Sequence, residues 1–149
     1  MTVQCRSVGS RFSWLCLAAG VLLLAGCNNM GAGPAASGAR VFAADVTGAA
    51  KSCTAATPAL KDGQVTETTM KVGNDGGWCG ISVEKGGKPF NAGLLTGRPT
   101  HGKVFIHTVG DVTRVDYTPD RGFVGTDTFI VKLLPGSAGF RTAVTVTGP

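Results

Sequence analysis

Apolar and polar side chains alternate along most of the chain beyond residue 50, with the period of two that is typical of β-strands with one buried face. In the run 112–117, Val115 and Tyr117 are expected to face the core, and Arg114 and Asp116 to face outward. Similar runs span 65–72, 78–84, 90–96, 102–109, 129–133 and 140–147. After the N-terminal 26 residues, no segment of ten or more keeps a helical period. The pattern predicts an all-β fold, a single antiparallel β-sandwich of seven or eight strands.

Turn residues between these runs indicate which strands are neighbours. Gly110-Asp111 predicts a hairpin of the two runs that flank it. The sequence Asn74–Gly77 has the residues of a tight turn and predicts a second hairpin. In the returning strand of that hairpin, Cys79 is expected to face the core and Trp78 the opposite side.

The stretch 117–129 is interpreted as a β-corner between two strands. Gly122 and Gly125 can adopt backbone angles that other residues resist, and Phe123 between them can cover the end of the sandwich. Asp127 is expected to accept hydrogen bonds from backbone amides across the corner. Replacing it with Ala should then lower stability by about 1 kcal/mol.

The corner is preceded by Pro99-Thr100-His101-Gly102-Lys103-Val104 and reads Tyr117-Thr118-Pro119, Gly122-Phe123, Gly125-Thr126-Asp127 and Phe129. In order and spacing, these residues resemble the end of a bacterial immunoglobulin-like (Ig-like) or cadherin-like repeat. The resemblance covers about 97–146, the last third of the chain. It implies a β-sandwich and often an extracytoplasmic setting, but no shared activity.

The N-terminal 26 residues have the features of a signal peptide. Arg6 and Arg11 precede the apolar run 14–26, whose 13 residues are fewer than the roughly 20 of a membrane-spanning helix. The run ends in Leu24-Ala25-Gly26-Cys27, which looks like a bacterial lipobox and predicts acylation of Cys27. The alternatives are an ordinary signal peptide with an unmodified cysteine, or an uncleaved anchor. By resemblance to enterobacterial lipoproteins, Asn28 favours the outer membrane.

Residues 27–50 are predicted to form a lipidated cysteine followed by a flexible linker. The segment from Asn28 is rich in Gly, Ala, Ser and Pro and offers little apolar surface to bury. Val41-Phe42 interrupts this composition and could dock as an initial strand. The Ig-like domain is therefore assigned to residues 51–149.

Two cysteines remain in the predicted domain, Cys53 and Cys79. An even number in an exported protein favours a disulfide over free thiols or a metal site. This bond would connect neighbouring strands of the two sheets. It would contribute roughly 3 kcal/mol in the chain-entropy model.

Charge is mild and scattered. The formal net charge of +5 falls to +3 once Arg6 and Arg11 are removed with the signal peptide. No cationic run marks a nucleic-acid site.

The chain contains no sequence motif of a catalytic site, so we expect no enzyme activity and no cofactor. His101 and His107 are the only histidines, and turn geometry explains His101. The aspartates are isolated, whereas calcium sites need clustered oxygen ligands. Neither zinc nor calcium is therefore predicted.

These features predict a cell-envelope protein that is held at the membrane by acyl chains on Cys27 and has a binding or structural role, such as adhesion, scaffolding or envelope contact. Its partner would be an envelope protein or polymer. Trp78, Phe105 and Ile130 are candidate contact residues because alternation places these apolar side chains outward. The alternative is an inhibitor or accessory subunit of a secreted or periplasmic enzyme, acting through the loop Asn74–Trp78.

Overall fold

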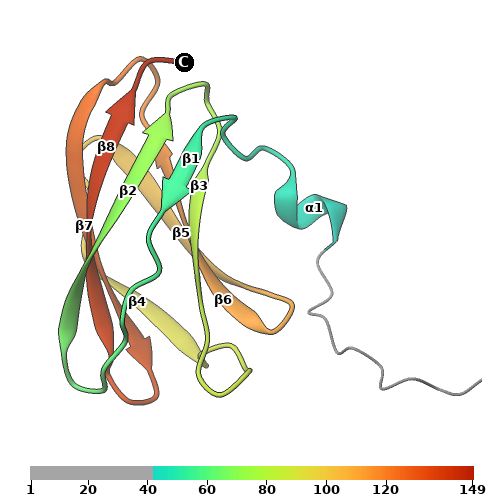
Figure 1. Ribbon diagram of the computed structural model, residues 1–149, viewed down its shortest axis with the longest axis vertical. Helices are drawn as coiled ribbons and strands as arrows, with labels where there is room; N and C mark the ends of the chain where they lie inside the picture. The colour runs from blue at the N-terminus through green and yellow to red at the C-terminus, as the bar shows by residue number, and fades with distance from the viewer. Residues whose placement is uncertain (1–41) are drawn as a thin grey trace, which may run out of the picture. The chain divides into compact units, whose positions relative to one another are not determined.

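A computed structural model describes residues 42–149 and contains one helical turn and eight strands (Figure 1). The elements are α1 (Ala43–Val46), β1 (Cys53–Ala55), β2 (Val65–Gly73), β3 (Cys79–Val83), β4 (Ala92–Gly97), β5 (Gly102–Val109), β6 (Val112–Pro119), β7 (Gly125–Leu134) and β8 (Gly139–Thr147). The strands form a five-stranded sheet, β1-β2-β8-β7-β4, and a three-stranded sheet, β3-β6-β5. The predicted all-β sandwich of seven or eight strands is thereby confirmed. The signal peptide, Cys27 and most of the predicted linker lie outside the described residues.

The hairpin predicted around Gly110-Asp111 is present, with β5 antiparallel to β6. One pair departs from the antiparallel expectation, because β2 and β8 run parallel over nine residue pairs. A short turn forces its strands to be antiparallel, but β2 and β8 are separated by five intervening strands, so no turn constrains them.

The predicted hairpin of β2 with β3 is wrong. These strands belong to different sheets, and the loop Asn74–Gly77 crosses from one sheet to the other. The Asn74 amide donates to the Thr147 carbonyl at the end of β8, and the Asp75 carboxylate accepts from the Lys51 and Gly77 amides. Local turn residues therefore formed a tight turn here without pairing the strands beside it.

The core lies between the sheets and follows the predicted alternation. Every second residue of β3, of β8 and of the second half of β7 is buried, as in the series Cys79, Ile81, Val83 on β3. Tyr117 of β6 and Phe129 of β7 stack across the core with ring centroids 5.8 Å apart.

The predicted disulfide between Cys53 and Cys79 is present and joins β1 of one sheet to β3 of the other, with Cα atoms 5.3 Å apart. Cys79 is buried, whereas Cys53 lies exposed on an edge strand. The bond therefore joins the two sheets at their margin.

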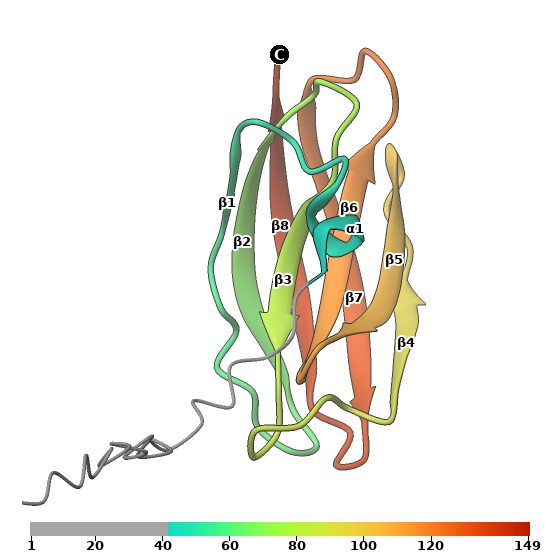
Figure 2. The ribbon, with the colours of Figure 1, turned by 90° about the vertical axis from the view of Figure 1, so that its right-hand side faces the viewer.

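Residues 42–50, which we call the strap, cross the outside of the three-stranded sheet (Figure 2). They include α1, so the expectation of no helix after the signal peptide is wrong by one turn. The Asp45 carboxylate accepts from the Phe42 amide and begins this turn, which is too short to give a sequence period. Phe42 is exposed and forms no strand, contrary to prediction, while its predicted partner Val41 lies outside the described residues. In place of a flexible linker, the strap contacts the sandwich up to the buried Ala50.

Candidate functional site

The three predicted contact residues do not share one surface. Trp78 and Phe105 lie on the outer side of the three-stranded sheet, which we call the three-strand face. Ile130 lies on the outer side of the five-stranded sheet, the five-strand face, between the buried Phe129 and Val131. A single surface containing all three is therefore excluded.

The three-strand face carries a charged cluster in which Arg114 and Asp116 are the central pair. Both point outward as predicted, yet they are only 8% and 6% exposed. Arg114 donates from Nε and Nη2 to Asp116 Oδ2 at 3.1 and 3.0 Å. Nε also lies 2.9 Å from Asp116 Oδ1, but its hydrogen does not point at that atom, so the two form no hydrogen bond. His107 Nε2 lies 2.9 Å from the same Oδ2 and donates to it, because a carboxylate only accepts.

Aromatic rings border this charged cluster on both sides. The Arg114 guanidinium lies 4.1 Å from the centroid of the Trp78 ring, and the Phe105 and His107 rings are 4.7 Å apart. A cation over an indole face is attracted by about 0.5–2 kcal/mol. We call Trp78, Phe105, His107, Arg114 and Asp116 the Arg114 cluster.

Strand register explains why the cluster forms. Antiparallel pairing places His107 opposite Arg114 and Phe105 opposite Asp116 on the neighbouring strand. On the other neighbour, Gly80 pairs with Asp116, and a Cβ at Gly80 would come within 2.5 Å of Asp116 Oδ1. Glycine at this position therefore leaves the space that the carboxylate occupies.

The strap lies over the Arg114 and Trp78 side chains of this cluster and is bound mainly through its backbone. Arg114 Nη1 donates to the Asp45 carbonyl, and Trp78 Nε1 donates to the Thr47 carbonyl at 3.0 Å. The Trp78 backbone pairs with Gly48 and Ala50 in a short parallel bridge. The strap thus contributes to the burial of Arg114.

The five-strand face has mostly short, uncharged side chains at its centre. Its outward side chains are Glu67, Thr69, Lys71, Leu94, Thr96, Thr126, Thr128, Ile130, Lys132, Arg141, Ala143 and Thr145. Leu94 is 47% exposed, and Ile130 is partly covered. Among residues 42–149, no segment crosses this face.

The corner has the arrangement predicted for Asp127. Its carboxylate accepts from the amides of Thr100 and His101 at 2.9 Å and from that of Thr128 at 2.8 Å, and the Tyr117 hydroxyl donates to it at 3.0 Å. Burial alone would raise the pKa of Asp127, but these hydrogen bonds together lower it below its ordinary value. Burial, followed by the bond to Asp127, raises the pKa of Tyr117.

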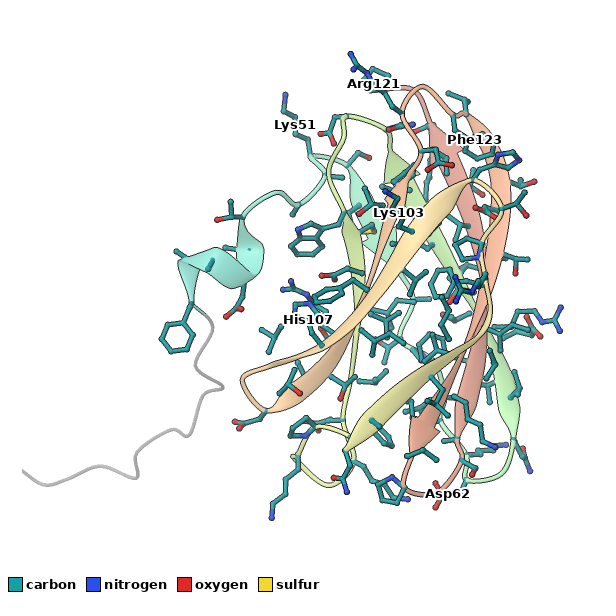
Figure 3. All side chains as sticks on the ribbon, turned by 180° about the vertical axis from the view of Figure 1, so that it is seen from behind. Lys51, Asp62, Lys103, His107, Arg121 and Phe123 are labelled. Atoms are coloured by element: carbon teal, nitrogen blue, oxygen red, sulfur yellow. A yellow bond between two sulfur atoms is a disulfide. The ribbon has the colours of Figure 1, made fainter. Side chains whose placement is uncertain are left out.

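The loop Asn74–Gly77 lies beside the corner at the same end of the sandwich. Asn74 Nδ2 donates to the carbonyls of Asp120 and Phe123 at 2.7 and 2.9 Å. A hollow of about 500 Å³ is bounded by Asn74, Asp75, Gly76, Pro119, Arg121 and Gly122. Figure 3 shows Arg121 at this end together with Lys51, with Asp62 at the opposite end.

The two histidines do not come together. His101 stacks on Phe123 with centroids 4.2 Å apart, whereas His107 belongs to the Arg114 cluster. Within residues 42–149, no group of three or more His, Cys, Asp or Glu side chains could hold a metal ion.

Sequence reasoning missed the burial of Arg114 and Asp116. A signal was present, since opposite charges two residues apart share one strand face. Their cover comes from a segment with a linker-like composition, and alternation cannot reveal such cover.

Comparison with protein-family models and with curated proteins finds no match for this chain. Among residues 42–149, no helix is long and apolar enough to cross a membrane.

Proposed function

We propose that this protein is a lipid-anchored Ig-like module of the bacterial cell envelope, held at the outer membrane through Cys27, with a binding or structural role. The lipobox-like Leu24–Cys27 supports the anchor. The disulfide between Cys53 and Cys79 supports export to an oxidising compartment. The β-sandwich agrees with the Ig-like resemblance of the last third of the chain.

The observation that carries the binding role is the contrast between the two outer faces. The segment that leads from Cys27 reaches the sandwich at the three-strand face and covers part of it. The five-strand face stays uncovered by residues 42–149. It presents Leu94 on its edge strand β4, opposite Lys132, and the short side chains of Thr128, Ala143 and Thr145 at its centre. A face with short side chains at its centre suits contact with a protein surface or an extended polymer.

Photo-crosslinking in the native envelope tests this role. A photoreactive amino acid at position 143, in the centre of the five-strand face, should give a discrete adduct that Leu94→Glu weakens. The matched control places the same amino acid at Glu84, an exposed position just after β3. Equal adducts from both positions, or none from position 143, would contradict a partner on the five-strand face.

The rigid loop Asn74–Gly77 favours a second candidate, an inhibitor or accessory subunit of a secreted or periplasmic enzyme. Its contacts with Asp120, Phe123 and Lys51 fix its conformation before any partner binds, and such preorganisation lowers the entropy cost of binding. Replacing Asp75-Gly76 with Ala-Ala should abolish inhibition or enzyme assembly in this case. Normal inhibition by that variant would exclude the loop.

A further inference from the structure

Large apolar side chains are exposed on the side of the molecule where the strap lies. Phe42, Val46 and Phe105 are 65%, 56% and 64% exposed. Phe42 and Val46 belong to the strap, and Phe105 belongs to the edge strand β5. The other large exposed apolar residues of the described chain lie elsewhere: Val65, Leu94 and Val124.

A chain of hydrogen bonds and ring contacts connects the strap to Phe105 on one surface. The backbone carbonyl of Asp45, within α1, accepts a hydrogen bond from Arg114. Arg114 and His107 both donate to the carboxylate of Asp116. The His107 ring contacts the Phe105 ring. Figures 1 and 2 agree that α1 projects from the three-stranded sheet, and Figure 3 shows His107 on the same side. We call Phe42, Val46 and Phe105 the anchor-side patch.

The patch lies where the chain from Cys27 reaches the sandwich. Fourteen residues separate Cys27 from Phe42, and even fully extended they span at most about 50 Å. An acyl anchor at Cys27 would therefore hold the patch within that distance of the bilayer. Tethering gives an effective local concentration on the order of millimolar, so a contact too weak to bind from solution can still be populated.

We propose that the anchor-side patch docks on the phospholipid bilayer, so that the three-strand face lies against the membrane and the five-strand face points away from it. This proposal rests on the proposed lipid anchor. Phenylalanine rings partition favourably into the membrane interface, and the exposed Lys103 on the same face favours anionic headgroups. Docking would present the five-strand face to partners in the surrounding compartment.

The test uses residues 27–149 with the Cys53–Cys79 disulfide intact, so that Cys27 is the one free thiol. Cys27 is coupled to a maleimide phospholipid in phosphatidylethanolamine–phosphatidylglycerol vesicles that contain a diazirine-bearing phospholipid. After photolysis, mass spectrometry locates the labelled peptides. We expect labelling within 42–46 and 103–107, reduced at least threefold by Phe42→Ser with Phe105→Ser.

The matched control is Leu94→Ser with Val124→Ser, which removes two exposed apolar side chains outside the patch and should leave labelling unchanged. Labelling confined to residues 27–41, or spread equally to 92–97 and 124, would overturn the docking proposal. Circular dichroism with thermal melting verifies that each variant is folded. Because the lipid is attached chemically, failure here counts against docking alone, whereas acylation of Cys27 in cells is tested separately.

Discussion

Asp116 and Asp127 are two carboxylates of the same sandwich with very different partners. Asp127 accepts from three backbone amides and one hydroxyl: two of these donors lie in the corner 117–129, and two lie in the preceding Thr100-His101 segment of the same motif. Asp116 is held by the charged Arg114 and by His107, beneath the strap. The comparison shows that local turn chemistry can be predicted from a motif, whereas a buried ion pair depends on strand register and on a covering segment.

The largest expected effect comes from breaking the ion pair. Arg114→Met should lower the free energy of unfolding by about 3 kcal/mol, because it leaves Asp116 buried without its cationic partner. Urea unfolding at neutral pH measures the loss. A loss below about 1 kcal/mol would show that water already reaches the carboxylate.

The double variant Arg114→Met with Asp116→Leu sharpens this result. Removing both charges removes the desolvation cost together with the attraction, so the double variant should be more stable than Arg114→Met alone. Additive losses from the two changes would contradict a coupled buried pair.

The next largest effect is expected at the corner. Asp127→Ala should cost about 2 kcal/mol, more than the sequence suggested, because it leaves the Thr100 and His101 amides and the Tyr117 hydroxyl without their acceptor. Asp120→Ala is the matched control, since its carboxylate accepts no hydrogen bond from residues 42–149. Equal melting temperatures for the two variants would argue against the role of Asp127.

Acid should remove the contribution of Asp127 to stability. The pKa of Asp127 is lowered in the folded chain, so its contribution is complete above the unfolded value of about 3.9 and is lost as the pH falls through the folded value. The stability difference between the natural chain and Asp127→Asn should therefore shrink between pH 5 and pH 2. A constant difference across this range, measured by urea unfolding, would contradict the assignment.

The smallest effect is expected for the strap. Trp78→Phe keeps a ring beneath Arg114 but removes the donor to the Thr47 carbonyl, a loss of about 1 kcal/mol. Hydrogen exchange should accelerate about fivefold in residues 47–50 while the strands exchange as before. Unchanged exchange would show that this hydrogen bond does not hold the strap.

Alternation predicted the sandwich, the β5–β6 hairpin and the core faces of β3, β7 and β8, because burial of one sheet face imposes a period of two. The disulfide followed from cysteine count and export. The hairpin predicted from the loop Asn74–Gly77 was wrong, because its residues specify a tight turn but not the sheet to which the following strand belongs. The parallel pairing of β2 with β8 leaves no local signal at all.

The candidate site was predicted less completely than the fold. Trp78 and Phe105 point outward as expected, yet Trp78 is partly covered by the strap and Ile130 lies on the opposite face. Outward direction follows from strand period, but exposure also depends on what packs over the sheet. The strap was predicted to be a linker because its sequence shows almost no pattern. It is held by four hydrogen bonds to its backbone groups and by one small buried side chain, that of Ala50.

The central claim, that an acyl anchor at Cys27 holds this sandwich at the membrane, is tested most directly by metabolic labelling. Bacteria expressing the full chain are grown with radiolabelled palmitate, and the protein is purified beside its Cys27→Ser variant. We predict label on the natural chain and none on the variant. An unlabelled natural chain, or equal label on both, would contradict the lipid anchor.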